Sequence, residues 1–480
     1  MAGWESDHFI VLRDGRAVHM GKGVTGSRSS QRKHDTGKMN CNNYMPTSLR
    51  GIANRARRDR NARFRDLSRL LSEENLRWCF YQLRKTAACG VDGVTFKEYE
   101  RDLDLNLERL VERLKKGAYR AKLVRRKHIP KGKGKTRPLG IPVLEDKLVQ
   151  LASAKILTAI FDGDFSENSW GYRKGRGARE ASRVLAQTLS HGRFGWVVEA
   201  DIKGFFTNLD HDWMVKMLEE RVEDRAFIGL IQKWMKAGVL EEDGKVVHPA
   251  TGTPQGGIIS PVLSNIYLHY VLDLWFESVV EKRCKGDAHF MRYADDFVCA
   301  FEYKADAEQF MEALERRLGK FRLEVAPDKT RMLKFSRYKE EPNEAFEFLG
   351  FEFRWVRSRK GKMWVRRRTS PKKLRASIEA FTEWIKANRH RRIGTLMRKV
   401  TQKFQGYWNY YGVVGNTQSL NKLYWECTKL LFKWLNRRSQ RRSYTWEGFN
   451  EMFKHFGISR PRIMETINRQ QEFNWKVSAK

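Results

Sequence analysis

The amino-acid sequence predicts an α+β fold whose C-terminal part is almost entirely helical. Up to about residue 360, short extended segments interrupted by glycine and proline alternate with short amphipathic helices. Two extended segments, "FMRY" and "FVCAFE", are separated only by "ADD" and predict a hairpin. Farther along, the apolar periodicity is helical and the composition is strongly basic. With 480 residues the chain is too long for one compact core, and we expect two to four domains.

The N-terminal part divides into a polar leader and a helical region. Residues 1–46 contain too little periodic apolar sequence to form a core, so we expect a flexible basic leader. From Thr47 a helical pattern carries arginines on nearly every turn, while Leu67, Leu70 and Leu71 face inward. These arginines form either a phosphate-binding face or an ordinary solvated one. After "CGVDGVT", apolar residues with helical spacing predict another helix: Leu103, Leu107, Leu110, Val111 and Leu114.

The middle of the chain mixes strands and helices. Glycines and prolines in "RRKHIPKGKGKTRPLGIPVL" exclude a long helix and predict short extended pieces. The segment "WVVEADIKGFF" is a candidate buried strand, in which Phe205 and Phe206 point to opposite faces. Residues 307–318 predict an amphipathic helix with these inward positions: Ala307, Phe310, Leu314 and Leu318.

The C-terminal helices combine an apolar stripe with many cations and aromatic rings. The stripe predicts a helix core, and the following "NRRSQRR" predicts a contact surface. Its members are Leu420, Leu423, Cys427, Leu430, Leu431 and Trp434. Most of the aromatic rings should pack between helices, while a minority could stack on RNA bases. They are Trp384, Tyr407, Trp408, Tyr410, Tyr411, Trp425 and Trp434.

The charge balance points to a polyanionic partner. Lys and Arg number 93 against 57 Asp and Glu, which gives a formal net charge of +36 spread over most of the chain. Such an excess favours nucleic-acid binding over a merely solvated basic surface. The six cysteines show no metal-ligand spacing, and no signal pattern or membrane-length apolar run is present. We therefore expect a cytoplasmic protein without a disulfide framework, a zinc site or a membrane partner.

Three aspartates carry the candidate chemistry. Asp201 ends the apolar run "WVVEA", and Asp295 and Asp296 lie side by side at the predicted hairpin turn. Adjacent carboxylates repel one another, so a pair in apolar surroundings needs a neutralising partner. Three carboxylates at strand ends suit two Mg²⁺ ions that assist phosphoryl transfer. Taken alone, a "DD" turn is more often simply solvated. The flanking sequence therefore decides between a solvated turn and a metal site.

The flanking sequence resembles the successive motif blocks of reverse transcriptases encoded by group II introns. The resemblance spans most of residues 47–450, and "YADD" is the form of the polymerase motif usual in that lineage. The blocks are "RPLGIPVLEDKLVQ", "ADIKGFF", "GTPQGGIISPVLSNIYL", "RYADDFVC", "LEVAPDKT" and "FEFLGFEF". Downstream, "FQGYWNYYGVV" and "LFKWLNRRSQRRSYTWEGF" are similar to the thumb, or maturase, region of the family.

The resemblance implies a right-hand polymerase, with fingers and a palm built on an antiparallel sheet, followed by an α-helical thumb or maturase domain. Its implied divisions follow the changes in composition. They are a leader at 1–46, an N-terminal helical extension at 47–86, fingers and palm at 87–360, thumb at 361–440, and a basic tail, a possible DNA-binding remnant, at 441–480.

The resemblance also implies roles for the acidic residues. Asp201 and Asp295 are expected as the primary ligands of two Mg²⁺ ions, and the Ile202 carbonyl is expected to complete one coordination shell. Asp296 is expected as a weaker ligand or a nearby charge.

Five further residues match substrate-binding positions of the family. Lys131 and Arg137 are expected to hold the incoming triphosphate, and a ring at Phe206 should clash with a 2′ hydroxyl. Gln255 in "TPQGG" should contact the nascent base pair or the template strand. Lys329 matches a lysine near the substrate phosphates, although a surface turn explains it equally well.

The sequence also departs from the family pattern. Many relatives carry a C-terminal endonuclease with clustered His, Asn and Cys, and this chain shows no such cluster. We therefore expect insertion, if it occurs, to use single-stranded or already nicked DNA. Lys174 and Thr207 replace the usual proline and aspartate without removing a catalytic group.

Together these features predict an RNA-directed DNA polymerase that binds group II intron RNA and assists its splicing and mobility. Its partners would be structured intron RNA, an RNA template, a DNA primer or target, and deoxynucleotides. Two alternatives stay open: a free-standing reverse transcriptase used in defence or repair, and an RNA-binding splicing factor with a vestigial polymerase. The sequence does not indicate an oligomeric state.

Overall fold

The structure, a computed structural model, describes residues 47–132, 135–248, 250–253, 256–338, 344–358, 360–438 and 443–465. The predicted leader and part of the predicted tail lie outside these ranges. The chain forms two compact units, and each unit is built from three separate segments of the sequence. The first comprises Met1–Arg173, Asp201–Arg283 and Phe310–Asp328, and the second comprises Lys174–Ala200, Cys284–Gln309 and Lys329–Lys480.

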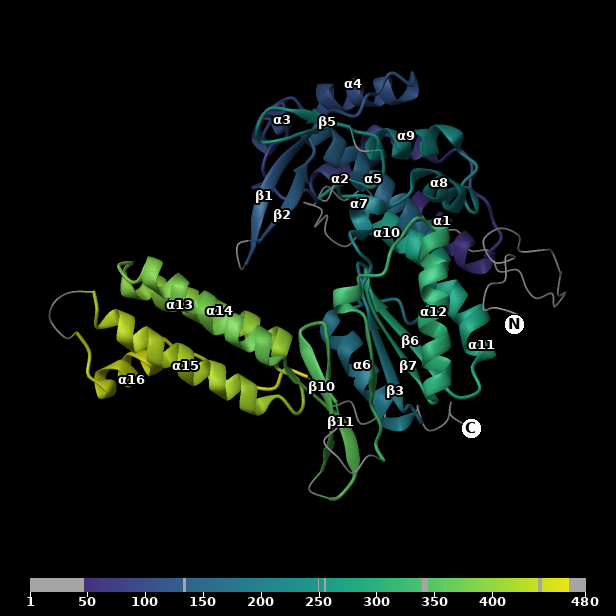
Figure 1. Ribbon diagram of the computed structural model, residues 1–480. Coiled ribbons are helices and arrows are strands. Elements are labelled where there is room, and N and C mark those ends of the chain that lie inside the picture. The colour runs from purple at the N-terminus through teal and green to yellow at the C-terminus, as the bar shows by residue number, and fades with distance from the viewer. Residues whose placement is uncertain are drawn as a thin grey trace, which may run out of the picture. The chain divides into compact units, whose positions relative to one another are not determined.

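The first unit consists of helices and one small sheet (Figure 1). Its sheet has the strand order β2-β1-β4-β5, with β1 and β4 parallel and the other pairs antiparallel. The strands are β1 (Val124–Gly132), β2 (Lys135–Ile141), β4 (Val239–Leu240) and β5 (Val246–Val247). The α-helices are α1 (Thr47–Arg58), α2 (Glu73–Phe80), α3 (Phe96–Arg101), α4 (Leu103–Lys115), α5 (Leu144–Phe161), α7 (Phe205–Asn208), α8 (His211–Glu219), α9 (Arg225–Met235), α10 (Ser260–Leu268) and α11 (Glu281–Arg283). Single helical turns complete it at Leu67–Leu70, His269–Asp273 and Phe276–Val280.

Helix α5 is the centre of the first unit. It is apolar around most of its circumference, and both α1 and α2 pack against it. The arginine-rich N-terminal segment is tied to this core by the buried Arg221, which forms an ion pair with Asp164 and donates through Nε to the Ala62 carbonyl at 3.0 Å. The predicted helix after "CGVDGVT" is confirmed as α4, where Leu103, Leu107, Leu110 and Val111 are buried.

The second unit contains two sheets and a helical bundle. Strand order in the sheets is β6-β7-β3-β8 and β11-β10-β9, all antiparallel. The strands are β3 (Trp196–Ala200), β6 (Ala288–Tyr293), β7 (Asp296–Phe301), β8 (Arg331–Lys334), β9 (Phe346–Phe348), β10 (Phe351–Arg357) and β11 (Met363–Thr369). The helices are α6 (Ala178–His191), α13 (Pro371–Asn388), α14 (Ile393–Tyr411), α15 (Thr417–Leu435) and α16 (Trp446–His455). Helix α12 (Lys304–Lys320) crosses the boundary between the units.

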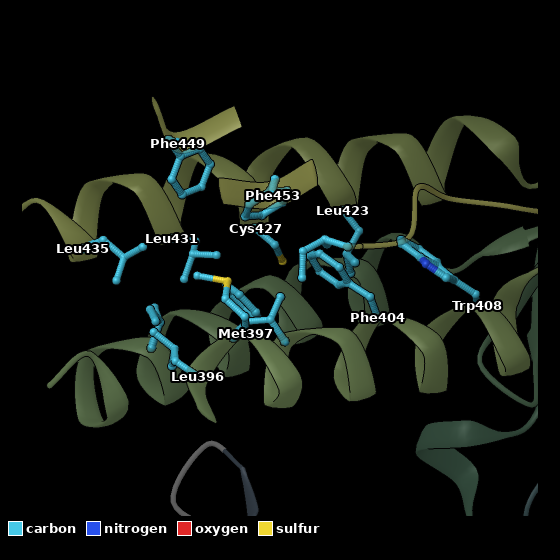
Figure 2. Packing of buried hydrophobic residues seen from close by; sticks show 14 of the residues in the cluster. Leu396, Met397, Phe404, Trp408, Leu423, Cys427, Leu431, Leu435, Phe449 and Phe453 are labelled. Atoms are coloured by element: carbon cyan, nitrogen blue, oxygen red, sulfur yellow. The ribbon is translucent and has the colours of Figure 1, made fainter. Parts of the chain in front are cut away.

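The predicted apolar stripe forms the core of the bundle. Figure 2 shows side chains from α14, α15 and α16 pointing toward one another, with Phe404 and Cys427 near the centre. The inward positions Leu420, Leu423 and Leu431 are buried. The predicted core assignment is thus confirmed, although Trp425 on the same helix is 59% exposed.

The α+β prediction is confirmed, and so are the hairpin and the amphipathic helix now seen as α12. One local prediction is wrong. The strand that begins "WVVEA" ends at Ala200, and Phe205 and Phe206 lie in the short helix α7 rather than on opposite faces of a strand. Gly204 precedes them with φ +56°, a conformation that ends extended structure. No helix in the described ranges is both long and apolar enough to cross a membrane.

Candidate active site

The predicted hairpin places its two aspartates in different positions. Tyr293 in β6 pairs with Asp296, the first residue of β7, so Ala294 and Asp295 form the two-residue turn. Ala294 has φ +58°, the sign that a type II′ hairpin turn requires at its first central residue. Asp295 is half-buried and Asp296 is exposed. A tight turn therefore fixes the backbone of Asp295 more firmly than a solvated loop would.

A buried arginine supports this turn. Arg292 is 0% exposed, and its Nη1 donates a hydrogen bond of 3.0 Å to the carbonyl of Ala294. Burying a guanidinium is costly unless hydrogen bonds satisfy it, so this arrangement ties the turn to the interior of the sheet. Sequence reasoning missed Arg292, because arginine in a strand usually indicates the solvent face.

The sheet register connects the hairpin to the third aspartate. Strand β3 pairs with β7, and Ala200 lies opposite Phe297. Asp201 directly follows Ala200, and Asp296 directly precedes Phe297. Two carboxylate residues 95 positions apart in the chain therefore adjoin the same end of this strand pair.

The segment after β3 is fixed by backbone hydrogen bonds. Ile202 forms an antiparallel bridge with Val325. The hydrogen bonds of this bridge use the neighbouring residues: Ala326 N donates to the Asp201 carbonyl at 2.8 Å, and Lys203 N donates to the Glu324 carbonyl at 2.9 Å. The Ile202 carbonyl takes no part in these two bonds.

The residues predicted to hold the triphosphate lie on the paired strands β1 and β2. Arg137 is exposed and lies opposite Ile129. Lys131 lies where the register of the β1–β2 pair shifts, between Pro130 and Gly132, and its side chain is not among those that the structure describes. Lys329 is exposed at the end of a helical turn, two residues before β8 begins.

The Phe206 segment anchors the loop that leads to Gln255. Phe206 is 8% exposed and packs edge-on against Phe205, with ring centroids 5.3 Å apart. Its carbonyl accepts from Thr253 N at 2.8 Å, while His211 Nε2 lies 2.6 Å from the Gly252 carbonyl. Gln255 itself lies outside the described residues. The local fold thus joins the predicted sugar-contacting ring to the start of the predicted template-contacting loop.

The far side of the loop is anchored as well. Gln150 Oε1 in α5 accepts a hydrogen bond of 2.9 Å from Ile258 N. A Cβ on Gly256 would lie 2.4 Å from the Gly140 carbonyl, so the loop runs directly against β2. Gln150 and His211 were not singled out from the sequence, because nothing in their spacing distinguishes a loop anchor from a core polar residue.

The donor set fits magnesium chemically, although the described side chains do not form a ready-made cage. Carboxylate and carbonyl oxygens are the ligands that Mg²⁺ prefers, and Mg²⁺ commonly shares its shell with substrate phosphates and water. Among the described residues, no group of three or more His, Cys, Asp or Glu side chains is arranged to hold a metal ion.

Comparison with known proteins identifies the class of enzyme. Residues 129–353, which contain all three aspartates, match the family described as reverse transcriptase (RNA-dependent DNA polymerase). Protein YkfC of Escherichia coli (strain K12) is 33% identical over 352 residues, covering 66% of this chain and 90% of that protein. The chain belongs to the reverse transcriptases of the group II intron type, which are RNA-directed DNA polymerases.

Relatives named for group II introns support that membership. The group II intron-encoded protein LtrA of Lactococcus lactis subsp. cremoris is 28% identical over 447 residues, covering 75% of this chain and 72% of that protein. The nuclear intron maturase 4, mitochondrial, of Arabidopsis thaliana is 31% identical over 133 residues, which covers 27% of this chain and 16% of that protein. The family predicted from the sequence motifs is confirmed.

Proposed function

We propose that the polymerase reaction occurs at the end of the β3–β7 strand pair, where Asp201 follows β3 and Asp295 and Asp296 lie at the start of β7. The observation that carries this proposal is the pairing of Ala200 with Phe297, which brings strands distant in sequence to one sheet end. Two bound Mg²⁺ ions would assist deprotonation of the primer 3′ hydroxyl and stabilise the leaving pyrophosphate. The absence of a complete cage among the described side chains fits a site that substrate oxygens complete.

The three carboxylates have unequal roles in this proposal. Asp201 and Asp295 would be the primary metal ligands, and the Ile202 carbonyl, which lies outside the two bridge hydrogen bonds, would complete one shell. Asp296 is exposed and begins a strand, so it would act as a weaker ligand or a nearby charge. The turn would hold the Asp295 carboxylate in place before substrate arrives.

The remaining predicted residues would bind the substrate and template. Lys131 and Arg137 would grip the triphosphate, the arginine through its bidentate fork. The Phe206 ring would exclude a 2′ hydroxyl, and Gln255 would contact the nascent base pair or template. Lys329, exposed beside β8, would add a positive charge near the phosphates.

We further propose that the protein binds group II intron RNA and assists its splicing and mobility. Support comes from relatives named as an intron-encoded protein and an intron maturase, and from the net charge of +36. In this proposal residues 47–86 are the N-terminal extension, 87–360 the fingers and palm, 361–440 the thumb, and 441–480 a basic tail.

The direct test is primer extension on an RNA template, with and without Mg²⁺, beside an RNA pull-down. Asp295→Ala should reduce extension by roughly 1,000-fold or more, because it removes a ligand acting in the transition state. RNA retention should stay near the wild-type level. Asp212→Ala, a substitution of the first-turn acid of α8, provides a matched control that should extend primers normally. Retained extension by Asp295→Ala would refute the metal assignment.

The sugar-excluding role of Phe206 has its own test. Phe206→Val leaves an apolar side chain but removes most of the ring, so incorporation of ribonucleotides relative to deoxynucleotides should rise roughly 10- to 100-fold. Steady-state insertion of matched rNTP and dNTP measures the ratio. Phe205→Val, at the more deeply buried neighbouring position, should lower stability without changing the ratio. Equal ratios in both variants would contradict the assignment.

A further inference from the structure

The ribbon formed by β10 and β11 has two chemically different faces. Directly opposite residues in antiparallel strands share a face, and faces alternate along each strand. One face carries three cross-strand pairs: Glu352 with Arg368, Arg354 with Arg366, and Val356 with Trp364. On the other face, Arg367 forms a buried ion pair with Glu465 at 2.9 Å. The first face, which carries Arg354, Arg366 and Arg368, is called the arginine face below. Its arginines are not each paired with a carboxylate in this way.

The arginine face places like charges directly opposite one another. Arg354 pairs with Arg366 across the strands, an arrangement that destabilises a sheet. Glu352 is an acid in contact with this cluster: its Oε1 lies 3.5 Å from Arg354 Nε and 2.7 Å from Arg368 Nη2. One carboxylate against three guanidiniums leaves an excess of two positive charges.

Two buried guanidinium donors on this face make no hydrogen bond to the described residues, although Arg354 Nε keeps its 3.5 Å ion-pair contact with Glu352. Arg354 Nε and Arg366 Nε are buried, and neither makes a hydrogen bond to any described residue. Each buried unsatisfied donor lowers the stability of the fold. Burial lowers the pKa of Arg366, and the neighbouring charges of Arg368 and Arg354 lower it further. A face that served only to stabilise the ribbon would not combine repulsion with unsatisfied donors.

The arginines are nevertheless held in place. A Cβ on Gly415 would lie 2.8 Å from Arg366 Cγ and 2.9 Å from Trp364 Cη2, so backbone packs directly against the stem of Arg366. Outward access remains, because the side chains of Arg354 and Arg368 are 43% and 33% exposed. The result is a fixed, accessible array of donors, which is the arrangement that anion binding requires.

The arginine face continues into a basic ribbon tip. No acidic residue occurs between Phe353 and Thr369 in the sequence. Arg357, Lys360 and Lys362 near the tip are exposed. A row of cations along a ribbon suits a polyanion with repeating charges better than a single small anion.

We propose that the arginine face and the ribbon tip bind phosphodiester groups of a nucleic-acid strand. This inference rests on the proposed function, because it assigns a binding surface to the nucleic acid that the polymerase uses. The phosphates supply hydrogen-bond acceptors to the Nε donors of Arg354 and Arg366, and they neutralise the excess charge. RNA and DNA strands offer the same group, so the experiment includes both.

The test compares Arg366→Gln and Arg354→Gln, alone and together, with wild type. Binding of labelled RNA, DNA and an RNA–DNA hybrid should weaken roughly 10-fold per substitution at 0.1 M salt. The slope of log Kd against log salt should fall by about one per substitution. The midpoint of thermal unfolding should hold or rise, because repulsion is removed. A structural role predicts the reverse, with a lower midpoint and an unchanged slope, and that result would overturn the proposal.

Controls separate this inference from the proposed chemistry. Arg193→Gln removes an exposed arginine already paired with Asp287, and it should leave the salt slope unchanged. Arg366→Lys should retain the slope but bind more weakly than wild type. Asp295→Ala should bind the hybrid with the wild-type salt slope although it no longer extends primers, whereas Arg366→Gln should need a higher hybrid concentration to reach half-maximal extension. A site for a small anion would give a different result: inorganic phosphate would raise the unfolding midpoint of the wild type, and the variants would bind the hybrid as the wild type does. That result would refute the proposal.

Discussion

Two hairpins of the second unit gather like charges of opposite sign. The β6–β7 hairpin ends in the adjacent carboxylates Asp295 and Asp296, whereas the β10–β11 ribbon carries Arg354 opposite Arg366. Neither arrangement favours folding by itself, because like charges held close together repel one another. In the proposals made above, a ligand of the opposite sign would resolve each conflict: metal cations at the first hairpin and phosphodiester groups at the second.

The two hairpins differ in how they are held. The β6–β7 turn is tied to the sheet interior by Arg292, which is fully buried and donates to the Ala294 carbonyl. On the arginine face, backbone at Gly415 packs against the stem of Arg366, and the side chain of Arg354 is 43% exposed. Catalysis demands an accurately placed carboxylate, whereas binding of a nucleic-acid strand shares its energy among several phosphate contacts. We therefore expect substitutions at the β6–β7 turn to lower polymerase activity more than substitutions on the arginine face.

Among substitutions that leave the aspartates in place, loss of the Arg292 anchor should have the largest effect. Arg292→Met removes the hydrogen bond to the Ala294 carbonyl, so the Asp295 carboxylate should lose its fixed position. We expect kcat for primer extension to fall roughly 10- to 100-fold while KM for the nucleotide changes little, because misplacement affects the chemical step. Single-nucleotide insertion kinetics would measure both constants, and Arg292→Lys should recover part of kcat.

Arg317→Met provides the matched control for that change. Arg317 is also buried, and its guanidinium donates to the carbonyls of Val271 and Tyr270 at 2.9 Å. Its replacement should lower the unfolding midpoint without selectively lowering kcat. If Arg317→Met and Arg292→Met reduced kcat in the same proportion as stability, Arg292 would have no special role in positioning the turn.

The comparison also shows which features could be predicted from the sequence. The hairpin was predictable because two short apolar runs bracket a short turn, and the bundle core because its apolar stripe follows the helical period. The family was predictable because several motif blocks occur in order. Asp201 was linked to the Asp pair through those motifs, since periodicity cannot pair strands so far apart in the chain.

Other features depend on tertiary context that the sequence pattern does not carry. Phe206 was expected on a strand, but the turn at Gly204 places it in a helix. Arg292 and the Arg354–Arg366 pair were missed because arginines occur throughout this basic chain. What distinguishes them is burial and register, which become visible only in the folded structure.

Removing the single carboxylate of the arginine face should have an intermediate effect. Glu352→Gln leaves three guanidiniums uncompensated, so the free energy of unfolding should fall by about 1–3 kcal/mol. Nucleic-acid binding should hold or strengthen, because the local positive charge increases. Chemical denaturation and hybrid titration at fixed salt would measure the two quantities. Weaker binding in the folded variant would show that Glu352 orients the arginines rather than merely neutralising them.

The smallest expected effect concerns the backbone of the β6–β7 turn. Ala294 adopts φ +58°, and the left-handed region costs an alanine about 1–2 kcal/mol that glycine does not incur. Ala300→Gly in the buried part of β7 is the control, because it removes the same methyl group at a position without positive φ. Both variants lose a buried methyl group and gain the same conformational freedom in the unfolded chain, so these two contributions largely cancel when the variants are compared. Ala294→Gly should therefore be more stable than Ala300→Gly by about 1–2 kcal/mol in denaturant unfolding. Equal stabilities would mean that the turn stores no strain, and that Asp295 is held by Arg292 and the strand pairing alone.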